Sequence, residues 1–533
     1  MTDAPDAAPF VPRLIDELLD RAAREHPTRI AVVAGSERFD YATLAARVDR
    51  LAAALQARGV AAGDRVAILD KNSVAYLELY YALPRIGAVA VPLNYRLALR
   101  EHHFLVEDAG ARVLVFGPGY EATARELALP LSIATPAADA AAGPPGALPW
   151  SALLADAAAH PTPVARDSGD VFLQMYTSGT TGRPKGAMLT HANLIANTMT
   201  AMHERDYTPA DNYLHVCPLY HCADLELYYG LTYACGGHVV LAEFHPAEVL
   251  ATIVRERVSV VFLVPAMINF LLEHLQPDHE LGSLRLIVYG GAAIPEDRLR
   301  RALERLPCQL SQGYGLTETS PLLCILPAAD HVLDGPRARR IASCGRPVWG
   351  VEVRVVEDDG SDCAPGVVGE IVARGANIMK GYWKQPEETA RALRGGWFHT
   401  GDLARRDEDG YLYIVDRKKD MIVSGGENVY PREVEEVLYT HPAVLEAAVI
   451  GVPSERWGET VKAVVVLRPG HDPGAAGVVD GAALIAYCRE RLAHYKCPTS
   501  VDLVAALPRN PSGKVLKREL REPYWTGQTR RVN

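Results

Sequence analysis

Segments with the pattern of a strand and segments with the pattern of a helix alternate along most of this chain. The apolar side chains of residues 43–56 recur at helical spacing, and residues 65–69 follow a Gly-Asp turn and are typical of a strand. The same alternation returns in a helix at 247–255 and a strand at 258–264. This succession predicts an α/β fold with layered, mostly parallel sheets and helices on both faces.

The length of 533 residues exceeds what one ordinary hydrophobic core accommodates, so several structural units are expected. Near residue 415 the pattern changes to short strands, a helix opened by Pro431, and strands at 447–452 and 460–467. We therefore predict a large N-terminal domain, residues 1–418, and a small separate α+β domain, residues 419–533.

The composition excludes several kinds of partner. The net charge of -10 disfavours a general nucleic-acid binder, because no basic patch offsets it. No signal peptide opens the chain, and no run approaches the ~18 apolar residues that cross a bilayer. The nine cysteines are scattered without a CxxC pair and are typical of reduced thiols, which predicts a cytoplasmic protein.

The segment Tyr176–Gly186, YTSGTTGRPKG, is the most informative string and follows a strand-like run at 171–175. Its glycines let backbone N–H groups approach phosphate oxygens, while hydroxyls and Lys185 add donors and charge. It is not a Walker loop, because Lys185 stands three residues after Gly182 and is followed by Gly186. Composition alone would also suit a turn without a ligand.

This string resembles the signature loop of the adenylate-forming superfamily, which comprises acyl-CoA synthetases, adenylation domains of peptide synthetases and luciferases. It has no departure at the fixed positions of that loop, and further motifs follow in the family's order as far as Lys514. The resemblance implies that the loop binds the phosphates of ATP through Thr177, Ser178, Gly179, Thr180, Thr181, Gly182 and Lys185.

Two more strings resemble the family's adenine and metal elements. Gly290–Ala293 is similar to the turn that borders adenine, and Gln312–Glu318 is similar to the YGxTE element. The resemblance implies that Tyr314 stacks on adenine, Thr317 meets the α-phosphate and Glu318 binds Mg²⁺; alone, Glu318 would be a solvated acid at a helix start. The residues expected around adenine are Gly291, Ala292, Ala293, Gln312, Gly313, Tyr314 and Gly315.

Further motifs imply the ribose site and a hinge. Thr400–Asp402 resembles the element whose aspartate, Asp402, contacts the ribose hydroxyls, and Asp416–Asp420 resembles the hinge. There Arg417 would reach the ribose and Lys419 would be the pivot of a mobile C-terminal domain.

The C-terminal part carries two more matches. The string SGGEN at 424–428 resembles the loop that borders the channel for the pantetheine arm of coenzyme A, and 508–514 resembles the element with the catalytic lysine, Lys514. The resemblance places CoA near Ser424, Gly425, Gly426 and Glu427.

Together these matches imply an ATP-dependent acid:CoA ligase with ATP, Mg²⁺ and CoA as cofactor and co-substrates. The acid would first form an acyl-adenylate at Lys514, and the C-terminal domain would then rotate about Lys419 to admit the thiol. An acyl-AMP ligase that loads a carrier protein, a luciferase-like oxidase and a nucleotide-binding pseudoenzyme stay open as alternatives, as does a homodimer.

The string Pro218–Glu226 resembles the mouth of the family's acyl pocket, with His221 as an aromatic gate residue. A medium or long-chain, alicyclic or aryl hydrophobic acid is favoured by resemblance to stand-alone bacterial synthetases. Asp224 and Glu226 are unusual there; we predict that they lie on a solvated helix edge. The competing hypothesis is that Asp224 lines the acid pocket.

Overall fold

The computed structural model describes residues 11–136, 146–177, 184–277, 279–292, 294, 296–425, 427–471, 479–509 and 515–526. Residues 137–147 have the Ala-, Gly- and Pro-rich sequence expected of a surface loop, and most of them lie outside the described residues.

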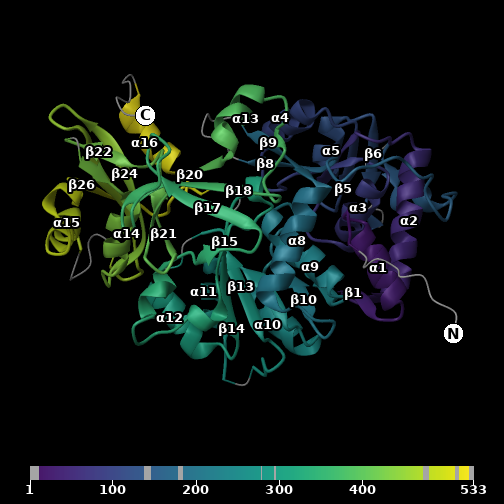
Figure 1. Ribbon diagram of the computed structural model, residues 1–533, viewed down its shortest axis with the longest axis horizontal. Helices are drawn as coiled ribbons and strands as arrows, with labels where there is room; N and C mark the ends of the chain where they lie inside the picture. The colour runs from purple at the N-terminus through teal and green to yellow at the C-terminus, as the bar shows by residue number, and fades with distance from the viewer. Residues whose placement is uncertain are drawn as a thin grey trace.

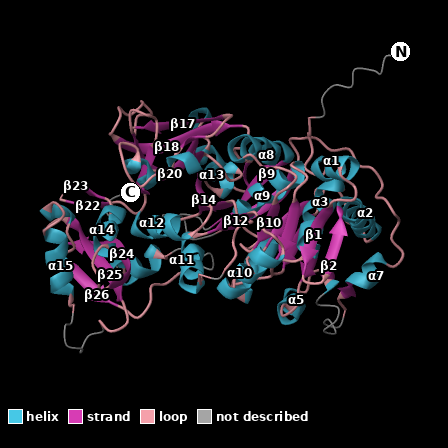
Figure 2. Ribbon diagram, turned by 90° about the horizontal axis from the view of Figure 1, so that it is seen from below, coloured by secondary structure: helices cyan, strands magenta, loops and turns pink. Residues whose placement is uncertain are grey.

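Two large sheets form the bulk of the molecule (Figures 1 and 2). The first contains, in spatial order, β16 (Arg346–Pro347), β15 (Cys324–Leu326), β14 (Gln309–Tyr314), β13 (Leu286–Gly290), β12 (Val260–Leu263), β10 (Asn212–His215), β11 (Gly237–Val240), β1 (Ile30–Ala34) and β2 (Glu37–Asp40). The second contains β19 (Gly381–Tyr382), β9 (Lys185–Thr190), β8 (Val171–Thr177), β4 (Val89–Pro92), β3 (Arg65–Leu69), β5 (Val113–Phe116), β6 (Leu131–Ala134) and β7 (Leu148–Pro149). Their inner strands pair in parallel, which confirms the predicted α/β class.

Helices connect these strands. In the N-terminal part they are α1 (Glu17–Glu25), α2 (Tyr41–Ala57), α3 (Val74–Arg85), α4 (Leu99–Ala109), α5 (Glu121–Leu127), α7 (Trp150–Leu154), α8 (His191–Arg205), α9 (Cys222–Tyr233), α10 (Pro246–Arg255), α11 (Pro265–His274), α12 (Glu296–Arg305) and α13 (Pro386–Ala392). Local capping explains where some of them begin: the side chains of Asp40 and Ser73 accept hydrogen bonds from backbone N–H groups in the first turns of α2 and α3.

A smaller antiparallel sheet, which the sequence patterns did not predict, follows the two large ones. It contains β17 (Val351–Val356), β18 (Val368–Gly375), β20 (Phe398–Arg406) and β21 (Leu412–Arg417). Asp330 is buried beside this sheet, and its carboxylate accepts hydrogen bonds from Tyr411 and Arg340.

The C-terminal part forms a fourth sheet with its own apolar core, at the left in Figure 1. The sheet contains β23 (Glu427–Val429), β22 (Ile422–Ser424), β25 (Gly458–Leu467), β24 (Val444–Ser454) and β26 (Ser500–Leu503), with helices α14 (Pro431–Tyr439), α15 (Gly481–Arg489) and α16 (Lys517–Trp525). A separate C-terminal domain is therefore confirmed as part of the fold.

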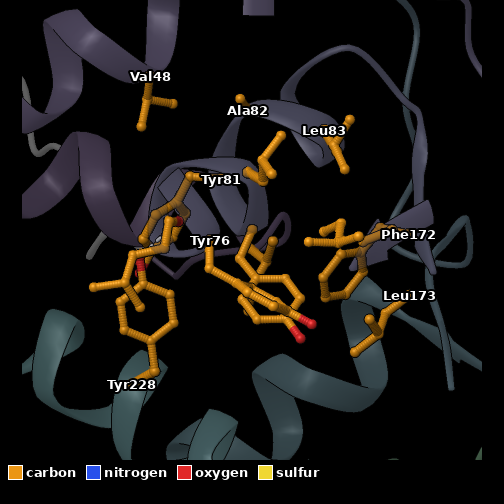
Figure 3. Packing of buried hydrophobic residues seen from close by; sticks show 14 of the residues in the cluster. Val48, Tyr76, Tyr81, Ala82, Leu83, Phe172, Leu173 and Tyr228 are labelled. Carbon is orange, nitrogen blue, oxygen red and sulfur yellow. Dashed lines mark hydrogen bonds between the residues drawn. The ribbon is translucent and has the colours of Figure 1, made fainter. Parts of the chain in front are cut away.

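Tyrosines fill the core where helices of the N-terminal part meet. Tyr76 and Tyr81 of α3 lie with Tyr228 of α9 and Phe172 of β8 in one buried cluster (Figure 3). The ring centroids of Tyr81 and Tyr228 are 5.2 Å apart and tilted by 53°, a favourable aromatic arrangement. Packing of α9 against α3 fixes the position of α9, which begins beside the candidate site.

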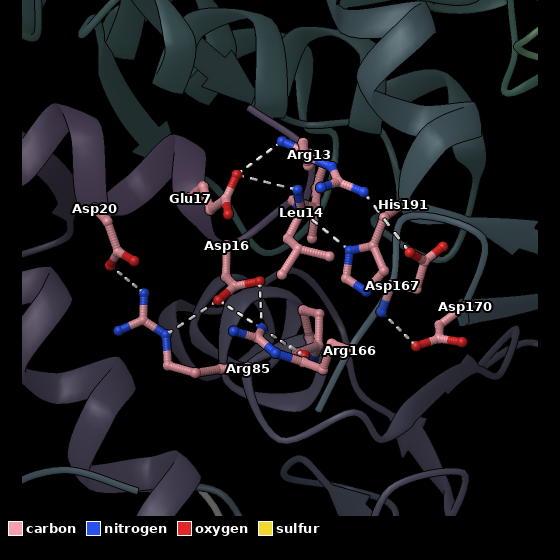
Figure 4. Close-up of polar contacts among 12 residues, drawn as sticks. Arg13, Leu14, Asp16, Glu17, Asp20, Arg85, Arg166, Asp167, Asp170 and His191 are labelled. Carbon is pink, nitrogen blue, oxygen red and sulfur yellow. Dashed lines mark hydrogen bonds and ion pairs between the residues drawn. The ribbon is translucent and has the colours of Figure 1, made fainter. Parts of the chain in front are cut away.

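Polar contacts anchor the N-terminal segment to the same core (Figure 4). The carboxylate of Asp16 accepts a hydrogen bond of 2.7 Å from Arg166, and the backbone N–H of Ile15 donates to Nδ1 of His191 over 3.0 Å. His191 is the first residue of α8, so this bond joins the start of the described chain to a helix far along the sequence.

Candidate active site

The carboxyl ends of β13 and β14 bring two of the predicted nucleotide elements side by side. Gly290 pairs with Gly313, so the turn at 291–292 lies next to the segment 312–315. Both elements require glycine for packing: a Cβ on Gly290 would lie 2.5 Å from the carbonyl oxygen of Gly313. Because these glycines have no side chains, the backbone at this sheet edge is not covered by side-chain atoms of its own.

Tyr314, Asp402 and Arg417 meet in one cluster, although they come from β14, β20 and β21; Tyr314 and Asp402 are buried, and the side chain of Arg417 is partly exposed. The hydroxyl of Tyr314 donates to Oδ2 of Asp402 over 2.7 Å, and Nε of Arg417 lies 2.5 Å from Oδ1. Burial would lower the pKa of the Arg417 guanidinium, but Asp402, Tyr314 and Glu318 outweigh it and raise that pKa. The cluster therefore holds a fixed cation, a carboxylate and an aromatic ring together.

Glu318 lies in a short 3-10 turn, Thr317–Thr319, and is buried with only 7% of its surface exposed. Its Oε1 accepts hydrogen bonds from Thr177 over 3.2 Å and from Tyr382 over 2.9 Å. Burial rules out the alternative of a solvated acid at a helix start. One carboxylate beside a hydroxyl is a donor set that suits Mg²⁺, which takes few protein oxygens and completes its shell with phosphate and water.

Lys185 opens β9 and is buried, with its amino group paired to Glu388 of α13. The same amino group lies 5.0 Å from the centre of the Tyr382 ring. The hydrogen bond from Lys185 lowers the pKa of Glu388. Several predicted site residues lie outside the described residues, so the structure tests none of them: Ser178, Gly179, Thr180, Thr181, Gly182, Ala293, Gly426 and Lys514.

The first turn of α9 borders this cluster. Sγ of Cys222 lies 3.5 Å from Oγ1 of Thr317, and His221 precedes the helix with its ring 4.4 Å from the ring of Tyr220. Sequence reasoning missed Tyr382 and Glu388, because neither stands in a string that indicates chemistry, and it passed over Cys222 inside the string 218–226.

Asp224 and Glu226 do not lie on a solvated helix edge, so that prediction is wrong. Both are buried, at 0% and 2% exposure, because α9 is covered on nearly every side. Asp224 accepts hydrogen bonds from Tyr213 over 2.5 Å and contacts Nδ1 of His215 at 2.6 Å. Since these partners take both oxygens of Asp224, its carboxylate serves the interior of the protein.

The predicted hinge lies where β21 ends. The backbone N–H of Lys418 donates to Gly401, and Arg521 of α16 donates to the carbonyl of Lys419 over 3.3 Å and pairs with Asp420 at 2.9 Å. Burial lowers the pKa of Lys419.

The predicted CoA loop forms the hairpin of β22 and β23, which carries Ser424, Gly425 and Glu427. Gly425 has a φ of +62°, and a Cβ there would lie 2.8 Å from the Trp457 ring. Among the described residues, no hydrogen bond or ion pair joins this hairpin to Tyr314 or Asp402. The structure thus brings together several of the residues predicted to bind the nucleotide, and it leaves the hairpin in the C-terminal domain.

In the part of the chain that the structure describes, every helix is too short or too polar to span a bilayer.

Comparisons with known proteins match the chain over nearly its whole length. The model of the family described as "AMP-binding enzyme" matches residues 19–383, and that of its C-terminal domain matches residues 433–514. A feruloyl-CoA synthase of Amycolatopsis sp. is 45% identical over 506 residues, 95% of this chain and 98% of that protein. A fatty acid–[acyl-carrier-protein] ligase, ScoC, of Streptomyces coeruleorubidus is 37% identical, covering 96% of each chain.

The fold also matches that of o-succinylbenzoate CoA synthetase (MenE) from Bacillus subtilis, solved in complex with its acyl-adenylate intermediate. The TM-score is 0.83 at 32% identity, over 94% of this chain and 97% of that one.

Proposed function

We propose, because this chain belongs to the family of AMP-binding enzymes, that it is an ATP-dependent carboxylic acid:CoA ligase that acts through an acyl-adenylate. The membership confirms the resemblance drawn from the motifs. The observation that supports the activity best is the convergence of Tyr314, Asp402 and Arg417 from three strands next to Glu318 and Thr177.

The first half-reaction activates the acid. A carboxylate is a poor electrophile because oxide is a poor leaving group, so its oxygen attacks the α-phosphorus of ATP and pyrophosphate departs. Cationic groups and hydrogen-bond donors stabilise the charge that builds on the phosphoryl oxygens. In our proposal Thr177 and Lys185 meet the phosphates, Arg417 and Asp402 the ribose, and Lys514 the carboxylate with the α-phosphate.

Glu318 is the residue proposed to hold Mg²⁺, which when bound would neutralise phosphate charge. The hydroxyl groups of Thr177 and Tyr382 orient its carboxylate, so the ligand position is set before any metal binds.

The second half-reaction transfers the acyl group to the thiol of CoA with release of AMP. We propose that residues 419–533 move as a unit about Lys419, so that Lys514 leaves and the hairpin with Ser424, Gly425 and Glu427 faces the acyl carbon. Within the described residues no hydrogen bond or ion pair joins the hairpin to Tyr314 or Asp402, which is compatible with such a movement.

The relatives indicate the class of acid, and the state of the cysteines bears on the cellular compartment. The 45% identity to a feruloyl-CoA synthase favours an aryl acid within the predicted range of hydrophobic acids. Every one of the nine cysteines is a free thiol, which suits a reducing compartment and supports a cytoplasmic location. A homodimer remains a prediction.

The test is acid-dependent release of pyrophosphate from ATP, measured over a panel of aryl, alicyclic and alkyl acids, followed by acyl-CoA formation. We expect pyrophosphate release with at least one acid and thioester only when CoA is added. No release with any acid would contradict the proposal and favour a nucleotide-binding pseudoenzyme.

A carrier-protein acceptor is the second candidate, since ScoC is named for that reaction. Supplying the same acyl-adenylate with CoA or with an acyl-carrier protein separates the two. If the acyl group were transferred faster to the carrier protein than to CoA, the carrier protein would be the acceptor in the proposed function.

A further inference from the structure

A buried arginine lies against the strand that carries Tyr314. Arg205, the last residue of α8, has a side chain with 0% exposure and pairs through Nε with Glu226 at 2.6 Å. Its Nη1 donates to Oγ of Ser311 over 2.7 Å. Within the described part of the chain, its Nη2 has no hydrogen-bond partner. A buried N–H group without an acceptor is costly, so it marks a place where an acceptor is expected.

A second unpartnered group belongs to the same region. Tyr207 follows two residues later, is 5% exposed, and its hydroxyl also has no partner among the described residues. Its ring packs against Gly230 of α9, where a Cβ would lie 3.0 Å from Cε2. The surrounding cluster is apolar and includes Tyr213, Cys217, Leu227, Phe262 and Val288.

Of these two groups, Arg205 lies behind the candidate active site. Nη2 of Arg205 is 3.2 Å from the point that a Cβ of Gly313 would occupy, and Gly313 directly precedes Tyr314. On the other side, α9 carries Glu226 in its second turn and Cys222 in its first, which contacts Thr317. An acid whose carboxylate lay near Thr317 and whose chain followed α9 inward would pass Gly313, which has no side chain, and approach Arg205.

We propose that Arg205 and Tyr207 bind an oxygen atom at the far end of the acid, and that the preferred substrates are carboxylic acids carrying a hydroxyl, ether or carbonyl oxygen there. This inference rests on the proposed function and narrows its substrate class. An Nη2 group donates only, whereas the tyrosine hydroxyl both donates and accepts, so together they suit a phenolic or alcoholic oxygen best.

Charge decides against a second carboxylate at this position. The Glu226 carboxylate already balances the Arg205 cation, at 3% and 0% side-chain exposure respectively. Another anion buried here would have no cation of its own and would bear the full cost of losing its hydration. A neutral oxygen satisfies the Arg205 N–H without adding charge.

The experiment compares two acids of the same shape, cinnamic acid and 4-hydroxycinnamic acid, by kcat/KM for pyrophosphate release. We expect the wild-type enzyme to prefer the hydroxylated acid by about tenfold or more, the size expected when a site must otherwise leave buried polar groups unpaired. The ratio should fall about threefold in Tyr207→Phe and approach one in the double variant Arg205→Met/Glu226→Met.

The double variant removes both charges, because Arg205→Met alone would strand the Glu226 carboxylate in the interior. A matched control is Arg47→Met/Glu78→Met, another Arg–Glu pair with a buried carboxylate, between α2 and α3. It should keep the wild-type ratio. A purely structural role of Arg205 would lower kcat/KM for both acids equally and leave the ratio unchanged.

Calorimetry with the sulfamoyl-adenosine analogues of the two acids gives the same ratio as binding constants, independently of turnover. Equal affinity of the wild-type enzyme for the two analogues would overturn the assignment, as would a preference that survives in the double variant. If the wild-type protein used no acid at all, the proposed function would fail with it; unchanged ratios in an active enzyme would remove the oxygen site alone.

Discussion

At the scale of single residues, Lys185 is held by a partner that ATP would have to replace. Its amino group pairs with Glu388, and a phosphate would compete with that carboxylate. We predict that Glu388→Gln lowers the KM for ATP about three- to tenfold, whereas Lys185→Met raises it about tenfold or more. Titration of ATP in a pyrophosphate assay measures both.

Arg391→Met is the control, since Arg391 also pairs with Glu388 but is largely exposed. It should leave the KM for ATP near the wild-type value. A higher KM in Glu388→Gln would show that the ion pair positions Lys185 for ATP instead of competing with it.

Asp224 belongs to a buried chain of hydrogen-bonded polar groups. The second prediction concerns how much this residue contributes to the stability of the folded protein. Beyond His215, Nε2 of that ring lies 3.0 Å from Nδ1 of His238. Asp224→Ala would leave Tyr213 and His215 without their partner, so we expect a loss of about 2–4 kcal/mol in the free energy of unfolding. Urea denaturation measures it, with the relative kcat/KM across acids unchanged; a changed acid preference would restore Asp224 as a pocket residue.

The sequence motifs predict a set of nucleotide-binding residues, but they do not predict which other side chains contact those residues in the fold. Tyr314, Glu318 and Asp402 stand in strings whose chemistry is local, so their types and spacing indicate a role. Tyr382 and Arg205 reach the region only through tertiary packing, and no neighbour in the sequence signals it. Asp224 was misplaced because an acid in a short helix usually faces water, a rule that fails for a helix buried on nearly every side.

At the scale of elements, the contact between the N-terminal segment and α8 is pH-sensitive. Burial outweighs the nearby Asp16 carboxylate and lowers the pKa of His191 to about 4, so the folded protein keeps the ring neutral. The neutral ring accepts the N–H of Ile15 (Figure 4). The contribution of the neutral His191 ring to the stability of the folded protein is complete above the ordinary pKa of about 6.5. It is lost as the pH falls from about 6.5 to 4.

We therefore predict that His191→Asn flattens the pH dependence of stability in this window. The wild-type protein should lose up to roughly 3 kcal/mol through this ring between pH 7 and pH 4, whereas Asn, which accepts the same bond without titrating, should not. Urea midpoints at several pH values measure the difference. The variant His331→Asn is the comparison, because burial also lowers the pKa of His331 to about 4. Identical slopes for wild type and His191→Asn would refute the assignment.

Element boundaries were predictable where a cap or a proline marks them. The helix expected at 43–56 lies within α2, which Asp40 caps, and α14 begins at Pro431 as expected. The antiparallel sheet of β17, β18, β20 and β21 escaped prediction, because strand pairing depends on partners that a local pattern does not specify.

At the scale of the whole molecule, we propose that the junction between the two domains determines which half-reaction the enzyme carries out. Asp416, at the end of β21, accepts the backbone N–H of Arg432 from the C-terminal domain over 2.9 Å, and Arg521 ties α16 to Asp420. Lys419 lies between these two attachments, so rotation of the domain must change the backbone torsions there.

We predict that Lys419→Pro slows thioester formation about tenfold or more and changes adenylate formation less than about threefold, since proline fixes φ near -65° and restricts the residue before it. Rapid-quench measurement of pyrophosphate and of acyl-CoA in a single turnover separates the two steps. Lys419→Ala is the matched control, because it removes the same side chain but leaves φ free. If Ala and Pro slowed thioester formation equally, the side chain and not the backbone would matter; if neither step changed, Lys419 would not be the pivot.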